Sequence, residues 1–203
     1  MIAIIDYGVG NLFSLTCSFK SIGADICVTS DPDVIAKAER IILPGVGAFE
    51  DAAKKLRESG LDKVIIDECA KGKPLLGICL GMQMLFERSY EYGEHEGLGL
   101  IKGSIKPIAE VIGEGLKIPH IGWNALHFCG EKDDLFKYIE EGDCVYFVHS
   151  YYGADCESSL IATAEYGAEL TAAVRNKNVC GVQFHPEKSE RVGLAILKAF
   201  CEI

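Results

Sequence analysis

The chain has 203 residues, of which 49% are hydrophobic and 25% are charged, and these proportions fit one globular domain of ordinary make-up. Its 30 acidic and 20 basic residues give a formal net charge of −10, and no basic run or basic patch with interleaved aromatic residues occurs. This composition excludes nucleic acid and anionic membranes as main partners. We predict a single domain over residues 1–203.

The first half of the chain alternates short apolar runs with helical patterns. Residues 2–5 predict a strand, and Leu12, Leu15, Phe19 and Ile22 then recur at helical spacing. Further strands are predicted at 26–29, 41–43 and 74–78, and helices from residue 31 and at 49–58, 61–71 and 80–86. Such alternation indicates an α/β fold with an open, mostly parallel twisted sheet, flanked by helices on both faces, with ligand sites at the carboxyl ends of its strands.

The second half changes to short β-like segments separated by glycine and proline turns. The predicted segments are strands at 125–128, 144–148, 160–164 and 179–184 and a final helix over 192–200 with one apolar face. We expect these to add extra strands, some of them antiparallel, to the same domain.

The cysteines and the apolar runs indicate the cellular compartment of the protein. The nine cysteines are an odd number without Cys-x-x-Cys pairs, and a chain of this length needs no disulfide framework. No positively charged leader precedes an apolar segment, and no apolar run reaches the roughly 18 to 20 residues that cross a bilayer. These features predict a cytoplasmic location and no membrane association.

The apolar run 75–78 stops at Cys79, which has a glycine two positions away on either side, Gly77 and Gly81. The related sequence Gly-x-Ser-x-Gly places its nucleophile at a tight strand-to-helix turn, beside a backbone amide. Glycine at the flanking positions avoids a collision with the neighbouring strand or with a substrate. Because a free cysteine is more often a buried small hydrophobe, the catalytic interpretation of Cys79 needs a base.

A base is offered near the C-terminus, where His185 is followed by Pro186 and Glu187. In an extended segment, residues two apart point to the same side, so we expect Glu187 beside His185, holding its imidazole in one tautomer. Cys79, His185 and Glu187 then fill the roles of nucleophile, base and orienting group. The five histidines show no His-x-x-x-His spacing, and no cysteines pair at zinc spacing, so we predict neither a metal nor a cofactor.

These motifs resemble the signatures of class-I (triad) glutamine amidotransferases, and the resemblance runs over nearly the whole chain. The segments that carry it are Gly77–Gln83, the turn Pro44–Gly47 and His185–Glu187. More narrowly, three other segments are similar to the glutaminase subunits of imidazole glycerol phosphate synthase, an enzyme of histidine biosynthesis. These are Asp6–Leu12, Pro119–Asn124 and Tyr146–Tyr151. Because the triad is shared across the family, the narrower resemblance depends on the last three segments.

The resemblance implies that the cysteine thiolate attacks the side-chain amide of L-glutamine and forms a thioester, which water then hydrolyses. The amide of Leu80, directly after the nucleophile, is predicted as one oxyanion donor, and the resemblance adds the amide of Val46. The implied substrate contacts are Gln83, Glu91, His149, Ser150, Tyr151 and Gly47. Gln83 lies one helical turn after Cys79, with an ordinary surface glutamine as the alternative. Glu91 is expected at the end of the same helix, with a solvated acidic face as the alternative.

Released ammonia is mostly protonated in water, so the resemblance also implies a partner that consumes it. The expected partner is a cyclase subunit with a (β/α)8 barrel, in a heterodimer. Candidate contacts are Asn11, Tyr146 and Trp123, the last with core packing as the alternative, and residues 119–122 are a candidate movable loop. Three other functions stay open: a glutaminase subunit for anthranilate or pyridoxal phosphate synthesis, a hydrolase of γ-glutamyl bonds, and a non-catalytic binding subunit.

Overall fold

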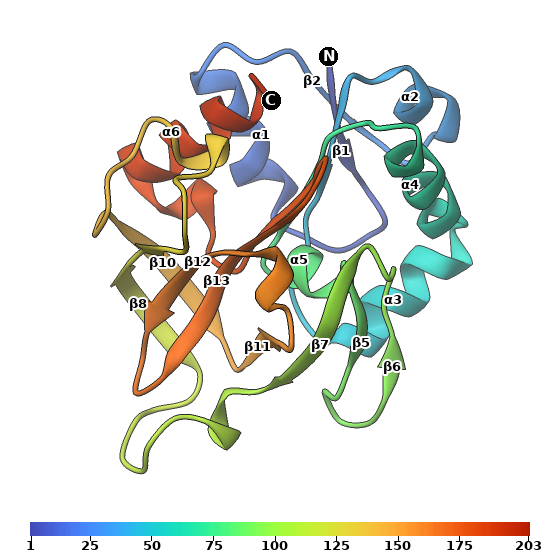
Figure 1. The fold of residues 1–203 in the computed structure, drawn as a ribbon. Coiled ribbons are helices and arrows are strands. Elements are labelled where there is room, and N and C mark those ends of the chain that lie inside the picture. Colours follow the sequence, from blue (N-terminus) through green and yellow to red (C-terminus); the bar gives the residue numbers. More distant parts are fainter.

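A computed structural model describes all 203 residues and shows one large sheet with helices on both faces and two smaller sheets beside it (Figure 1). The helices are α1 (Leu12–Ser21), α2 (Pro32–Lys37), α3 (Phe49–Glu58), α4 (Leu61–Ala70), α5 (Leu80–Met84) and α6 (Glu190–Phe200). The strands are β1 (Ile2–Ile5), β2 (Ile26–Thr29), β3 (Arg40–Leu43), β4 (Leu75–Ile78), β5 (Phe86–Ser89), β6 (His95–Glu96), β7 (Ile101–Pro107), β8 (His120–Ala125), β9 (His127–Phe128), β10 (Cys144–His149), β11 (Tyr151–Ala154), β12 (Leu160–Glu165), β13 (Glu169–Asn176) and β14 (Val179–Val182). None of the helices has the length and apolar character needed to cross a membrane.

The large sheet has the strand order β2-β1-β3-β4-β14-β13-β12-β9. Its first five strands are parallel, and the last three are added in antiparallel pairing. The predicted fold class is therefore confirmed. Because β14 pairs with β4, the turn after Ile78 and the turn after Val182 lie next to each other at the carboxyl end of the sheet.

The sheet separates two hydrophobic cores. Strand β1 shows why, since Ala3 and Ile5 face one core, while Ile2 and Ile4 face the other. Helices α2, α3 and α4 cover the first face, and α1 and α6 cover the second (Figure 1). All four residues of β1, and likewise all four of β4 and β14, are buried, which explains why the sequence reads as continuous apolar runs there.

Several expectations about element boundaries are wrong. The strand expected at 125–128 is divided between the end of β8 at Ala125 and the short strand β9, and the strand expected at 179–184 ends at Val182. The helix expected at 80–86 ends at Met84, and Phe86 begins β5, which pairs with β7. The run from Leu75 to Phe86 is buried throughout, so its apolar pattern cannot separate helix from strand. The loop proposed at 119–122 is mostly strand, because His120–Ala125 pairs residue by residue with β10.

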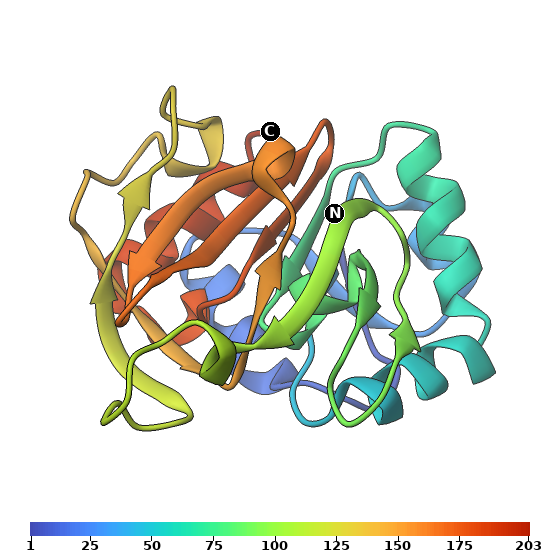
Figure 2. The same ribbon diagram turned by 60° about the horizontal axis from the view of Figure 1, so that its bottom comes forward.

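The second small sheet has the order β11-β7-β5-β6 and packs against the large sheet through β7 and β11. Figure 2 shows β7 running between the large sheet and the β5–β6 hairpin. Tyr92 and Gly93 at the hairpin tip have positive φ angles, 53° and 142°. The hairpin thereby brings the residues after Ser89 over the carboxyl end of the large sheet, where the candidate site lies.

Candidate active site

Cys79 occupies a strained turn between β4 and α5, with φ 55° and ψ −112°. Its amide donates to the carbonyl of Val182 at 2.8 Å, which ties the turn to β14. A Cβ at Gly81 would overlap the carbonyl oxygen of Leu43 on β3, and a Cβ at Gly77 would lie 2.7 Å from the carbonyl oxygen of Gly81. The flanking glycines are therefore required by close packing, as the sequence predicts, and the strain holds the sulfur at the edge of a cavity.

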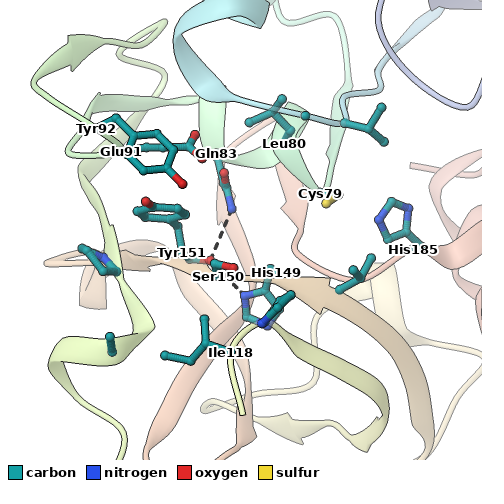
Figure 3. Close-up of a pocket in the computed structure, with 16 residues that line it drawn as sticks. Cys79, Leu80, Gln83, Glu91, Tyr92, Ile118, His149, Ser150, Tyr151 and His185 are labelled. Carbon is teal, nitrogen blue, oxygen red and sulfur yellow. Dashed lines mark hydrogen bonds between the residues drawn. The ribbon is translucent and has the colours of Figure 1, made fainter.

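His185 and Glu187 are in contact, with 2.8 Å between Nδ1 of the imidazole and Oε1 of the carboxylate. Both side chains are buried. The contact arises differently from the expectation, because Pro186–Lys188 is a 3-10 turn rather than extended chain. The backbone of His185 is fixed by its amide, which donates to Tyr146, and by its carbonyl, which accepts from the hydroxyl of Ser189. Figure 3 shows the imidazole facing Cys79 from the segment that follows β14.

The environment of His185 favours its charged form. Burial alone lowers the pKa of this imidazole, but its interactions with Cys79 and Glu187 outweigh burial and raise the pKa to about 10. A protonated imidazole beside the thiol is the arrangement that stabilises a thiolate. The second carboxylate oxygen of Glu187, Oε2, is buried without a partner, so the interaction of this carboxylate is concentrated on His185.

Cys79 and His185 border a cavity of about 520 Å³, while Glu187 is buried behind His185, and the cavity lining includes most of the residues proposed from the sequence. These are Val46, Gly47, Cys79, Leu80, Gln83, Glu91, His149, Ser150, Tyr151 and His185. The amides of Leu80 and Val46 donate to no acceptor within the protein. They lie on the two sides of the nucleophile's turn, since Gly45, which precedes Val46, packs directly against the amide of Gly81.

Gln83 is buried, so the alternative of a surface glutamine is wrong. Its side-chain Nε2 donates to the carbonyl of Tyr151 at 3.3 Å (Figure 3). The same nitrogen also donates to Oε1 of Gln183 at 3.0 Å. Both donors of the amide are thus used within the protein, and its oxygen remains available to a ligand. Gln183 in turn places its Nε2 3.8 Å from Sγ of Cys79. Sequence reasoning missed Gln183, although a buried glutamine between apolar residues at the end of a strand is a usable signal.

Glu91 lies in the cavity wall, but its position differs from the expectation. It follows strand β5 rather than ending a helix, and its Oε2 accepts from the amide of Phe49 at 2.6 Å, at the start of α3. Burial raises the pKa of Glu91, so the alternative of a solvated acidic face is wrong for this residue. Beside it the sequence missed Tyr92, whose ring is 88% exposed and meets the ring of Tyr151 edge-on at 6.4 Å.

The opposite wall is formed by the end of β10 and the start of β11. His149 donates from Nδ1 to the carbonyl of Tyr151 at 2.9 Å, and its Nε2 lies 3.0 Å from Nδ1 of His120. Burial lowers the pKa of His149 to about 4, so the side chain is neutral at neutral pH. His120, which the sequence did not single out, lies behind this wall and does not line the cavity.

The three candidate interface residues lie on different elements. Asn11 caps α1, because its side chain accepts from the amide of Ser14 at 3.3 Å. Trp123 on β8 is 49% exposed, so the alternative of core packing is wrong, and its ring meets that of Tyr146 edge-on at 6.2 Å. No group of three or more His, Cys, Asp or Glu side chains is arranged to hold a metal ion.

A cysteine at a strained strand-to-helix turn, an imidazole that follows the adjacent strand and a carboxylate on that imidazole are typical of enzymes that cleave an acyl bond through a thioester. The sequence comparisons narrow this class. The family model described as Glutamine amidotransferase class-I matches residues 3–202. The chain belongs to this family, which confirms the resemblance and the enzymatic class predicted from the sequence.

Curated relatives match the chain over its whole length. Imidazole glycerol phosphate synthase subunit HisH of Wolinella succinogenes is 46% identical, with 100% of both chains covered. The protein of the same name from Caldanaerobacter subterraneus is 50% identical, with 100% of this chain and 98% of that one covered. Among solved structures, PurLQS from Thermotoga maritima superimposes with a TM-score of 0.76 at 20% identity, covering 99% of this chain and 97% of that one, which supports the fold.

Proposed function

We propose that this chain is the glutaminase subunit of an imidazole glycerol phosphate synthase. The observation that carries the proposal is that Cys79 and His185 line a cavity of about 520 Å³, with Glu187 bound to His185, in a chain 46% identical to subunit HisH of Wolinella succinogenes. In the proposed reaction, the thiolate of Cys79 attacks the side-chain amide carbon of L-glutamine. The oxyanion that forms accepts hydrogen bonds from the amides of Leu80 and Val46.

The proton of the His185 imidazolium then passes to the leaving nitrogen, the carbon–nitrogen bond breaks and ammonia departs. The remaining γ-glutamyl thioester is attacked by water, whose proton returns to His185, and glutamate is released with the thiolate restored. Glu187 keeps the imidazole in one orientation through both steps.

The far end of the cavity suits the amino-acid end of glutamine. The free side-chain oxygen of Gln83 and the carboxylate of Glu91 are both acceptors, which an ammonium group requires. Gly47 and the backbone of His149, Ser150 and Tyr151 complete the wall.

The ammonia requires a second subunit, for which we propose a cyclase with a (β/α)8 barrel, in a heterodimer. Large apolar side chains are exposed on the surface: Val46, Tyr92 and Ile118 in the cavity lining, Phe13 on α1, and Ile121 and Trp123 on β8. Aromatic residues exposed in this way are enriched at protein interfaces, and Asn11 and Tyr146 lie on neighbouring elements. The nine cysteines form no disulfide, which supports a reducing, cytoplasmic location.

The test is production of glutamate and of the cyclase product by the chain co-purified with its cyclase subunit. We expect Cys79→Ala to abolish glutamine-dependent product formation while leaving formation from added ammonia intact. Glu187→Gln is expected to lower the glutamine-dependent rate by roughly a hundredfold or more, because the imidazole loses its orienting carboxylate. Full glutamine-dependent activity of Cys79→Ala would refute the proposed mechanism, and activity only with a different synthase would refute the assigned partner.

A further inference from the structure

The turn between β1 and α1 contacts Pro44, next to the turn that carries Cys79, and the proposed function gives these contacts no role. Tyr7, in this turn, is 6% exposed, and its hydroxyl donates to the carbonyl oxygen of Pro44 at 2.7 Å. No other donor in the protein bonds to that carbonyl. From the same turn, Gly10 approaches so closely that a Cβ there would lie 3.1 Å from Cβ of Pro44.

Pro44 and Gly45 are therefore held between two layers. On one side stands the β1–α1 turn, and on the other side stands the nucleophile's turn, because a Cβ at Gly45 would lie 2.7 Å from the amide nitrogen of Gly81. The next two residues are much less confined. Val46 is 43% exposed, and a Cβ at Gly47 would meet nothing within 4 Å. The place of the Val46 amide is thus set mainly by the contacts made at Pro44 and Gly45.

The hydrogen bond from Tyr7 is well suited to holding Pro44 in place. Burial, and the neighbouring Cys79, raise the pKa of the phenol above its ordinary value, so it remains a donor throughout the physiological range. A buried carbonyl that loses its only partner carries the full cost of desolvation. Without the hydroxyl, turning the carbonyl of Pro44 toward water lowers the free energy. We expect the amide of Val46 to move with it.

We propose that Tyr7 is a positioning residue for glutamine hydrolysis, whose hydroxyl holds Pro44 and thereby places the Val46 amide where the oxyanion forms beside Cys79. The inference rests on the proposed function, since it takes the Val46 amide as an oxyanion donor. Its effect belongs to the transition state, because the oxyanion exists only there and in the tetrahedral intermediate.

The experiment measures the kinetics of the Tyr7→Phe variant in complex with the cyclase subunit. Losing an oxyanion donor costs about a hundredfold or more in rate, and displacing one costs less, so we expect kcat for glutamine hydrolysis to fall roughly tenfold. KM for glutamine is expected to stay within about twofold, since the acceptor end of the cavity is untouched. The rate at which iodoacetamide alkylates Cys79 should also be unchanged, because that displacement forms no oxyanion.

Tyr138→Phe is the matched control, since Tyr138 also donates its hydroxyl at 2.7 Å, to Glu202, on a surface outside the cavity lining. Its kcat should equal that of the unsubstituted complex. An unchanged kcat in Tyr7→Phe would overturn the inference, as would a fall in kcat matched by an equal fall in alkylation rate, which indicates a disturbed nucleophile. If Cys79→Ala is inactive in the same assay, such a result leaves the proposed function standing and removes only the role of Tyr7.

Discussion

The buried imidazole of His149 determines which groups donate and which accept in the hydrogen bonds that link Tyr151, His149, His120 and Asn124. Its Nδ1 faces the carbonyl of Tyr151, so Nδ1 must carry the proton and Nε2 must accept. The facing Nδ1 of His120 must therefore donate, and its own Nε2 must accept from the side-chain amide of Asn124, 3.4 Å away. A proton added to His149 has no acceptor at Nε2 and breaks this order.

The pKa of His149 predicts how stability depends on pH. This pKa is about 4 in the folded chain, below the ordinary value of 6.5, so between these values the unfolded chain binds the additional proton. Stability therefore rises with pH across this window and is lost as the pH falls toward 4. Between pH 5 and pH 7 we expect the free energy of unfolding to rise by up to about 2 kcal/mol more in the unsubstituted chain than in His149→Asn. Urea unfolding at the two pH values measures this, and equal rises would contradict the prediction.

The contacts of some single residues can be predicted from the sequence alone, and those of others cannot. Cys79, His185 and Glu187 stand in short motifs with a chemical meaning, so their proximity was predictable before the strand order was known. Gln183 and His120 act through partners that are 100 and 29 residues away, respectively, and no local pattern announces those contacts. The partners become visible only when β14 lies beside β4 and β8 pairs with β10.

Among the elements, the short helix α5 is the one most tightly fixed by glycine. Gly81→Ala places a Cβ against the carbonyl of Leu43, so α5 must move away from β3 and take Cys79 with it. We expect a loss of about 1–3 kcal/mol in unfolding free energy and a larger proportional loss of glutaminase activity. Gly113→Ala is the control, because a Cβ there meets nothing within 4 Å and should change neither quantity. Chemical unfolding and glutamate production report the two effects, and equal behaviour of the two variants would contradict the argument.

Helix boundaries were predictable where the helix has one exposed face. In α3 the buried residues Phe49, Ala52, Ala53 and Leu56 alternate with charged ones, and the predicted range 49–58 is the observed one. Around α5 every residue from Leu80 to Met84 is buried, so the apolar pattern continues into β5 without a break. The boundary there is decided by pairing with β7, which lies beyond any local window.

At the scale of the whole molecule, the exposed aromatic residues predict how the chain meets its partner. Trp123→Ala is expected to weaken association with the cyclase subunit at least tenfold, because a half-exposed tryptophan at an interface centre is a typical energetic hot spot. Tyr138→Ala is the control, since Tyr138 has a similar exposure of 44% but lies outside β8 and β10, with its hydroxyl bonded to Glu202 after α6. Titration of each variant with the cyclase measures the two affinities. Equal affinities would remove Trp123 from the interface.

The pairing of β14 with β4 also sets the order in which the site comes into being. Strands β2, β1, β3 and β4, with the nucleophile at their edge, are complete once residue 79 has been synthesised, whereas the imidazole arrives more than a hundred residues later. A chain still emerging from the ribosome therefore holds a thiol without its base. We therefore expect the unfinished chain not to hydrolyse glutamine. Activity should begin only when β14 pairs with β4 and brings His185 beside Cys79.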